Sequence, residues 1–412
     1  MFELIAEGSA VIKIKKAEKI SKEMDVFYNP VMKLNRDIAI LLLQHFPPMH
    51  LCDPLAASGV RSIRLAKELK YKSIAINDAN KKAVKSIKNN LKFNKLNNNK
   101  KLKIYNEDAN LFLSNSKGFD YIDIDPFGTS NYYLDAAIKR ISRNGILAVT
   151  NTDTAALTGT YPNACARKYW AAPKLDYMMH ETGLRILIRK VQLIGMQYEK
   201  AIFPIFSYFK GHYFRVFFRC LKGKKICDEI AEKHGMLNGA GPLWLGSLWD
   251  KKLVNRMYAA LLKSYNKKNS INNYAINRLN NNKDSMNKLN INKNNNTIIR
   301  NTMNKSNNAI IKNSKKINDK SIKNNEKIII NDNKNELLKF LKTIKYECRI
   351  NSIGFYDLHD IAEKRKLRSM STKANIIRKI KNKGFAASET HFSGTGIRSN
   401  IPYAKLLPLL KG

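Results

Sequence analysis

The feature that most constrains this chain is a regular alternation between residues 36 and 151. Segments with a helical period alternate there with short apolar runs bounded by Asp, Asn or Gly. This alternation is typical of a mostly parallel sheet wound with helices on both faces. The sequence therefore predicts an α/β fold with a Rossmann-like sheet. We expect strands at residues 50–53, 73–77, 102–105, 119–124 and 145–151, and helices at residues 36–46, 60–69, 81–93 and 132–141.

Acidic residues follow the predicted strands at the point where each strand ends. Asp53 ends the first strand, Asp78 follows the second, Asp108 comes shortly after the third, and Asp125 follows the fourth. Open α/β sheets bind their ligands at the carboxyl ends of the strands. The alternative for any one acid is that it caps a strand end or a helix N-terminus.

The loop after the first strand, Asp53–Arg61, favours a cofactor that carries an adenosine and donates a methyl group. Its small residues allow a close approach of backbone to ligand. It contains one glycine, which departs from the Gly-x-Gly-x-x-Gly pattern and disfavours a dehydrogenase. Asp78 can accept hydrogen bonds from both ribose hydroxyls, and Asp108 and Ala109 would face the adenine.

The tetrapeptide Asp125-Pro126-Phe127-Gly128 follows the fourth strand, where amino-group methyltransferases place their catalytic residues. The lone pair of an exocyclic amine is conjugated with its ring and is a weak nucleophile. The Asp125 carboxylate and the Pro126 carbonyl can accept its N–H bonds, and Asp125 can take up the surplus proton. Phe127 offers a stacking face, worth roughly 1–3 kcal/mol per base. The alternative is an ordinary turn between strand and helix.

The charge of the chain points to a polyanionic partner. The formal net charge is +41, from 74 Lys and Arg against 33 Asp and Glu, which creates a positive potential over much of the surface. The alternative is a codon bias toward A and T, because Lys, Asn and Ile are all used heavily.

The cysteines and the hydropathy indicate a cytoplasmic protein. The five cysteines are odd in number and scattered, which is not a disulfide framework in so long a chain. No apolar run approaches the roughly 20 residues that span a bilayer, and the N-terminus does not resemble a signal peptide. We therefore expect a reducing cytosol and no membrane insertion.

The sequence divides into two predicted domains, at residues 1–222 and 223–412. An Asn/Lys-rich insertion of low complexity, predicted to be poorly ordered, interrupts the second at about 263–335. After it we expect helices at 336–348, 357–366 and 372–382, a strand at 384–392 and a turn at 393–396. This order indicates a smaller α+β, winged-helix-like module, and its basic residues suit a nucleic-acid surface.

Several ordered segments resemble the tRNA guanine-N2 dimethyltransferase family that modifies guanine 26. The resemblance covers most of the chain outside the insertion. The segments are Glu7-Gly8-Ser9-Ala10, Val26-Phe27-Tyr28-Asn29-Pro30, Asn35-Arg36-Asp37, Asp53–Arg64, Asp125–Gly128, Thr152–Leu157, Cys165–Tyr169 and Gly241-Pro242-Leu243-Trp244.

The resemblance implies two successive methyl transfers to N2 of one tRNA guanine, with two molecules of S-adenosylmethionine. It also implies roles by position. Asp125 is the catalytic carboxylate, with Pro126 beside it, and Phe27 and Phe127 sandwich the flipped base. The cofactor-binding residues are Arg36, Asp53, Arg61, Asp78, Asp108 and Ala109. From the residues alone, Phe27 could equally be a core residue and Arg36 a charge on a helix surface.

The sequence departs from the family at one place. Members often carry paired cysteines for zinc before the Gly-Pro-Leu-Trp segment, but only Cys220, Cys227 and His234 are available here. A structural zinc site needs four ligands, so we predict no metal. His212 is expected to be an ordinary polar residue.

Two other functions remain open at this stage. The same corner chemistry would serve an amino-methyltransferase that acts on another RNA or DNA base. The chain could also be a non-catalytic RNA-binding protein that retains the fold. The intact Asp53, Asp78 and Asp125 argue against lost activity. The sequence points to tRNA as the partner and gives no sign of an obligate protein partner.

Overall fold

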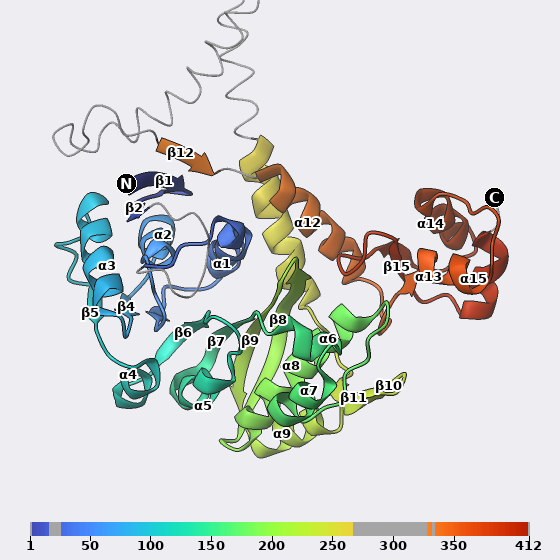
Figure 1. Ribbon diagram of the computed structural model, residues 1–412, viewed down its shortest axis with the longest axis horizontal. Helices are drawn as coiled ribbons and strands as arrows, with labels where there is room; N and C mark the ends of the chain where they lie inside the picture. The colour runs from blue at the N-terminus through green and yellow to red at the C-terminus, as the bar shows by residue number, and fades with distance from the viewer. Residues whose placement is uncertain (1, 16–25, 267–327, 332–333, 411–412) are drawn as a thin grey trace, which may run out of the picture.

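A seven-stranded sheet forms the centre of the computed structural model, which describes residues 2–15, 26–266, 328–331 and 334–410 (Figure 1). Its strand order is β5-β4-β3-β6-β7-β9-β8. The first five strands of this order are parallel, and β9 runs antiparallel to both of its neighbours. The strands are β3 (His50–Asp53), β4 (Ser73–Asn77), β5 (Leu102–Tyr105), β6 (Phe119–Ile124), β7 (Ile141–Asn151), β8 (Lys200–Lys210) and β9 (Tyr213–Lys222).

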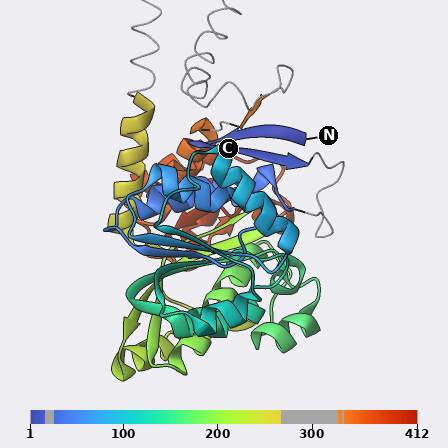
Figure 2. The same cartoon turned by 90° about the vertical axis from the view of Figure 1, so that its left-hand side faces the viewer.

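Helices cover both faces of this sheet (Figures 1 and 2). One face carries α1 (Lys33–Leu43), α2 (Val60–Glu68) and α3 (Lys81–Phe93), and the other carries α4 (Ala109–Asn115), α5 (Asn131–Arg140) and α8 (Met179–Met196). The parallel strands are buried between the two layers, which explains their apolar runs. The predicted α/β fold is confirmed. The strands at 50–53, 73–77, 102–105 and 119–124 have the predicted bounds, whereas β7 begins at Ile141 rather than Gly145.

An N-terminal hairpin, which the sequence did not predict, packs over α2 and α3. It consists of β1 (Phe2–Glu7) and β2 (Ala10–Lys15), and β1 also pairs in parallel with β12 (Ile328–Asn331). The side-chain amides of Asn90 on α3 and Asn94 at its C-cap accept hydrogen bonds from the β2 backbone at 2.8 and 3.0 Å. These bonds satisfy the free edge of β2 and place Glu7 beside α1 and α2.

The region after β7 supplies helices and a second hairpin. It contains α6 (Thr154–Thr158), α7 (Pro162–Tyr169), α9 (Lys224–Ala231), β10 (His234–Leu237), β11 (Ala240–Trp244) and a helix at residues 251–266. β8 and β9 are joined by Gly211 and His212, and Gly211 has a φ of 59°. A glycine at the first position of a two-residue turn is a hairpin signal that the sequence carried.

The C-terminal module has the predicted winged-helix-like order. It contains α12 (Lys334–Glu347), β13 (Tyr356–Asp357), α13 (Leu358–Lys364), α14 (Lys373–Asn382), β14 (Ala387–Glu389), β15 (Gly396–Ser399) and α15 (Tyr403–Leu410). The small antiparallel sheet has the order β13-β15-β14. The predicted strand at 384–392 is shorter than expected, and α15 was not predicted. Residues from Leu358 to Leu410 form a core of their own.

Of the predicted insertion at 263–335, only the two ends lie within the described residues. Residues 263–266 continue the helix that begins at 251, and β12 and the start of α12 lie at the other end. Residues 267–327 and 332–333 lie outside the described residues. All five cysteines are buried free thiols. None of the helices in the described part of the chain is long and apolar enough to cross a membrane.

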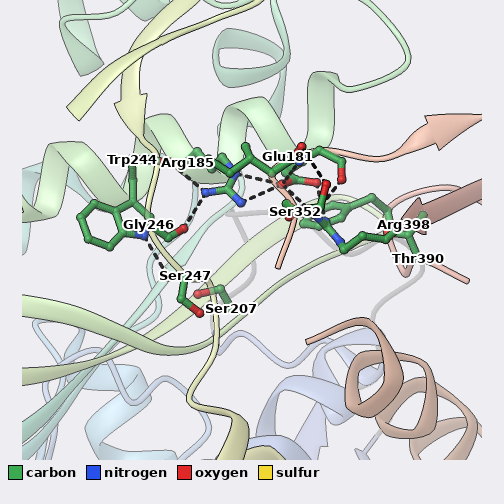
Figure 3. Close-up of polar contacts among 12 residues, drawn as sticks. Glu181, Arg185, Ser207, Trp244, Gly246, Ser247, Ser352, Thr390 and Arg398 are labelled. Carbon is green, nitrogen blue, oxygen red and sulfur yellow. Dashed lines mark hydrogen bonds and ion pairs between the residues drawn. The ribbon is translucent and has the colours of Figure 1, made fainter. Parts of the chain in front are cut away.

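A buried ionic cluster joins the C-terminal module to the central fold (Figure 3). Arg398 on β15 donates to Glu181 on α8 at 2.6 Å and to Glu347 on α12 at 3.0 Å. The side chains of all three residues are fully buried. Arg185 donates to the same Glu181 at 2.9 Å and to the carbonyl oxygens of Trp244 and Gly246. The module is therefore held to the sheet layer by desolvated charges.

Candidate active site

A cavity of about 490 Å³ opens at the carboxyl ends of β3, β4 and β6. Eight of the ten predicted site residues line it: Phe27, Arg36, Asp53, Arg61, Asp78, Asp125, Pro126 and Phe127. The other two, Asp108 and Ala109, are not among the lining residues. The topology explains why these residues line one cavity, because parallel strands bring their carboxyl ends to one edge of the sheet.

The loop between β3 and α2 forms the floor of the cavity. Ala57 and Gly59 have φ values of 49° and 76°, so the backbone turns through the left-handed region twice. The Ala57 N–H donates to Asp78 at 2.8 Å, and the Asn80 N–H donates to the other oxygen of Asp78 at 2.8 Å. Asp78 is thereby fixed at the end of β4, with lone pairs left to accept from a ligand.

Asp53 lies at the end of β3 and is almost fully buried. It accepts a hydrogen bond from the Ser62 hydroxyl at 2.7 Å. Burial raises the pKa of Asp53 to about 7, the Arg61 guanidinium opposes the shift, and the Asp123 carboxylate adds to it. This carboxyl group can therefore change its charge near neutral pH.

Arg36 reaches the cavity from α1 and is held from behind by Glu7. Its Nε and Nη2 donate to the two oxygens of Glu7 at 2.6 and 2.5 Å, and Nη2 also donates to the Asn29 carbonyl. Glu7 further accepts from Tyr28 and from Arg64, each at 3.0 Å. Burial opposes ionisation of Glu7, but Arg36 and Arg64 outweigh it and lower the Glu7 pKa to about 2. Arg36 is thus a positioned cation.

A chain of alternating charges runs beneath the catalytic corner. Arg61 pairs with Asp125 and, at 2.9 Å, with Asp123. Arg215 on β9 donates to both oxygens of Asp123 at 2.8 Å. Burial disfavours the charge on Asp123, whereas Arg215 and Arg61 lower its pKa to about 2. Asn35 completes the support by accepting from Arg61 at 3.1 Å. This chain fixes the orientation of the Asp125 carboxylate.

Phe27 and Phe127 meet at the mouth of the cavity. Their ring centroids are 4.1 Å apart and the rings are inclined at 69°. Phe127 is 48% exposed, which is unusual for so large an apolar side chain. Two rings that sandwich a base must be about twice the stacking distance apart, so this pair has to separate before a base enters. Phe27 lies at this mouth rather than in the core.

The predicted adenine-facing residues lie one strand further along the sheet. Asp108 caps α4, because its carboxylate accepts from the N–H groups of Asn110 and Leu111 at 2.9 and 3.1 Å. Ala109 is buried in the first turn of that helix. Asp108 and Asp78 both raise the pKa of Tyr133, after burial as the larger cause, so all three groups are neighbours. Tyr133 lines the cavity.

The loop after β7 supports the catalytic corner. Gly128 has a φ of 73°, its N–H donates to the Thr152 hydroxyl at 2.7 Å, and its carbonyl accepts from the Thr152 N–H at 2.9 Å. Thr152 lines the cavity. Asp153 instead pairs with Lys168 and accepts from Tyr169. Of these two residues, only Thr152 lines the cavity.

Sequence reasoning did not assign roles to several supporting residues. Glu7, Asn35, Asp123 and Arg215 all act behind the cavity wall. Glu7 and Asn35 lie inside segments that carried the family resemblance, which was a usable signal. Arg215 carried none, since its partner Asp123 is distant in sequence.

The residues considered for zinc do not gather into one site. Cys220 lies on β9 and Cys227 on α9, and the His234 ring is hydrogen bonded to Gln192 at 2.9 Å. In the described residues, no group of three or more His, Cys, Asp or Glu side chains is arranged to hold a metal ion. The prediction of a zinc-free protein remains a prediction. His212 lines the cavity from the turn between β8 and β9.

The fold and the site together define a class I S-adenosylmethionine-dependent methyltransferase. The features that define this class here are the parallel sheet, the small-residue loop, Asp78 and the Asp125-Pro126-Phe127 corner. The chain belongs to the N2,N2-dimethylguanosine tRNA methyltransferase family, whose model matches residues 8–239 and 308–411.

Similar proteins cover nearly the whole chain. The tRNA (guanine(26)-N(2)/guanine(27)-N(2))-dimethyltransferase of Aquifex aeolicus is 31% identical over 443 residues, which span 98% of this chain and 95% of the relative. The tRNA (guanine(26)-N(2))-dimethyltransferase of Methanocaldococcus jannaschii is 32% identical over 427 residues, spanning 96% and 95%. Among solved structures, Trm1 from Pyrococcus horikoshii with S-adenosyl-L-methionine matches with a TM-score of 0.76 at 29% identity, covering 99% of this chain and 100% of that one.

Proposed function

We propose that this enzyme transfers two methyl groups in succession from S-adenosylmethionine to N2 of guanine 26 in tRNA. The observation that carries the proposal is the meeting of Asp125, Phe27 and Phe127 at the mouth of one cavity whose floor is the Asp53–Arg61 loop. A catalytic carboxylate flanked by two aromatic rings suits a planar base that presents an amino group. The family relationship identifies that base as guanine.

The cavity fits the methyl donor. Its volume lies in the range of about 300–1,000 Å³ that is usual for cofactor sites. Asp78 keeps lone pairs for the ribose hydroxyls. The described residues bond Arg36 at Nε and Nη2, so Nη1 can offer its N–H pair to the carboxylate of the methionine portion. Asp53, Arg61, Asp108 and Ala109 complete the proposed contacts. When bound, the cofactor supplies an electrophilic methyl group.

Asp125 and Pro126 prepare the amine. We expect each to accept one N–H bond of the guanine amino group, which localises the nitrogen lone pair and directs it toward the donor. An N–C bond then forms as the donor's S–C bond breaks. The amine is left with one surplus proton, which passes to the Asp125 carboxylate and on to solvent. Arg61 holds that carboxylate in place throughout.

The base has to leave the tRNA stack to reach this corner. Flipping costs a few kcal/mol, and stacking on Phe27 and Phe127 offsets part of that cost. We assign contacts to the tRNA backbone to the predicted C-terminal domain at 223–412, within which residues 358–410 have a separate core. The basic side chains of this domain fit phosphate binding, and a tRNA substrate fits action in the cytoplasm.

The substitution Asp125→Asn tests the assignment. We expect methyl transfer to fall by at least about 100-fold, because the amide cannot take up the proton. S-adenosylmethionine binding should change little. Mass spectrometry of nucleosides from a treated tRNA transcript measures the product and maps its position, and calorimetry measures cofactor affinity.

The same experiment separates the alternatives. Product at guanine 27 as well as 26 would indicate the broader position range in the name of the Aquifex aeolicus relative. Methylation of adenine in DNA, or wild-type turnover by the Asp125→Asn variant, would refute the proposal. Absence of cofactor binding by the wild type would favour a non-catalytic RNA-binding protein.

A further inference from the structure

Helices α5 and α7 present large aromatic side chains to solvent close to the catalytic corner. Tyr132 at the start of α5 is 73% exposed, and Tyr161 and Trp170 at the two ends of α7 are 63% and 50% exposed. Apolar rings of this size are normally covered. We call the surface formed by Tyr132, Tyr161, Arg167, Trp170, Arg189 and Lys190 the α5–α7 surface.

Direct hydrogen bonds fix this surface to the loop that follows Phe127. The Asn131 side chain donates to the Lys168 carbonyl at 2.9 Å, and the hydroxyls of Thr129 and Tyr169 lie 3.0 Å apart. The Asn151 amide also donates to Tyr169 at 2.9 Å. Figure 1 shows α5, α7 and α8 on the same side of the sheet. These bonds place α7 directly beside the loop that leaves the catalytic corner.

Contacts of its backbone and its ring fix Trp170 in an exposed position. Its backbone is left-handed with a φ of 55°, its N–H donates to Ala166, and its carbonyl accepts from Arg189 at 3.2 Å. The Lys190 ammonium lies 3.0 Å from the centre of the indole ring. One face of the ring is thus covered by a buried cation, and half of the side chain is still open to solvent. This arrangement presents a stacking platform.

The cations of this surface lack carboxylate partners. Within the described part of the chain, no acidic side chain pairs with Arg167, Arg189 or Lys190, and no acceptor meets Nε of Arg189. Burial, with Arg189 as the second cause, lowers the pKa of Lys190 to about 8. The neighbouring Lys168 and Lys174, by contrast, each pair with an aspartate. An anion would relieve the crowding of Arg189 and Lys190.

We propose that the α5–α7 surface binds the tRNA nucleotides next to the flipped guanine. Trp170 and the two tyrosines stack on bases that flipping has exposed, while Arg167 and Arg189 hold phosphates. The eight residues of α7 rise about 12 Å, a length that accommodates about two nucleotides. The inference rests on the proposed function and adds a tRNA contact within the methyltransferase domain.

The test compares this surface with a matched pair at the far end of α5. Trp170→Ala and Arg167→Ala alter the surface. Tyr198→Ala and Lys139→Ala are the controls, because Lys139 lies over the Tyr198 ring at 5.2 Å in the last turn of α5. The measurements are kcat and KM for a tRNA transcript, the salt dependence of tRNA binding, and the affinity for S-adenosylmethionine.

We expect Trp170→Ala to raise KM for tRNA about tenfold, with cofactor affinity unchanged. Arg167→Ala should reduce the slope of log affinity against log salt by about 0.7–0.9, as for one lost phosphate contact. Both control variants should stay within about twofold of the wild type.

Two results would overturn the inference. One is a wild-type KM and salt slope in both surface variants. The other is an equal loss of tRNA and cofactor affinity, which would indicate a collapsed site rather than a lost tRNA contact. If Trp170→Ala fails to fold, the exposed Arg167 decides alone. A wild-type enzyme that binds tRNA but methylates no guanine would refute the proposed function and leave the binding comparison intact.

Discussion

Two buried clusters of arginine and glutamate invite comparison. In the cavity cluster, Glu7 holds Arg36 through bonds of 2.5 and 2.6 Å, with Arg64 beside them. In the junction cluster, Glu181 holds Arg398 through a bond of 2.6 Å, with Arg185 beside them (Figure 3). Glu347 also accepts from Arg398 there. Both carboxylates are fully buried and both have lowered pKa values, because the arginines outweigh the effect of burial.

The clusters differ in the hydrogen-bond donors that the arginine leaves unused. Arg398 uses all three of its nitrogens, since Nη1 also donates to the carbonyls of Ser352 and Gly354 at 2.9 and 2.8 Å. Among the residues that the structure describes, Arg36 donates from Nε and Nη2 only, and it lines the cavity. Two buried arginines with the same partner type therefore have different roles. A guanidinium that bonds through all three nitrogens holds parts of the fold together, and one whose Nη1 is unused can receive a ligand.

The largest effect we expect is on stability, from Arg398→Met. Methionine fills similar space, but among the described residues Glu181 keeps only one ion pair, with Arg185, and Glu347 keeps only hydrogen bonds to Thr390 and His391. Removing one member of a buried ionic cluster costs about 3–5 kcal/mol. Denaturant unfolding measures the loss. A loss below about 1 kcal/mol would show that the junction is not held by this arginine.

Arg36→Met applies the same change to the cavity cluster. Glu7 retains Arg64 and Tyr28, so we expect a smaller stability loss of about 1–3 kcal/mol. Cofactor affinity should instead fall between about tenfold and 100-fold, which corresponds to one charge-assisted hydrogen bond. Calorimetry with S-adenosylmethionine on both methionine variants makes the comparison. Equal cofactor affinities in the two variants would show that Arg36 has no greater role in cofactor binding than Arg398.

The parts of the fold that could be predicted are those set by local patterns. The apolar runs of β3, β4, β5 and β6 end at acidic or polar residues, and their bounds agree with the sequence prediction. The Asp125 corner and the Asp78 position follow from the same pattern, because strand ends share one edge of the sheet. The winged-helix-like order of elements at the C-terminus could also be predicted, because local patterns set it.

The parts that could not be predicted depend on distant pairings. Glu7 meets Arg36 and Arg64 only because the N-terminal hairpin folds over α2 and α3, and no local pattern specifies that docking. Arg215 on β9 meets Asp123 on β6 although β7 lies between these two strands in the sheet and 92 positions separate the two residues in sequence. Charged residues buried in this way look like surface charges until their partners are known.

The smallest effect we expect is a pH dependence that belongs to the cavity side. Burial sets the pKa of Asp53 at about 7, whereas the Glu347 pKa is lowered to about 2, so the junction carboxylate stays ionised near neutrality. S-adenosylmethionine carries a net positive charge, so its affinity for the enzyme should rise severalfold, and less than about tenfold, between pH 6 and pH 8 as Asp53 ionises.

The stability of the fold should change in the opposite direction. Because the folded pKa of Asp53 is raised, its contribution to the free energy of unfolding is lost as pH rises from about 4 through 7. Asp53→Asn should flatten both trends, which calorimetry and denaturant unfolding across this range would measure. An unchanged pH profile in that variant would place the titrating group elsewhere.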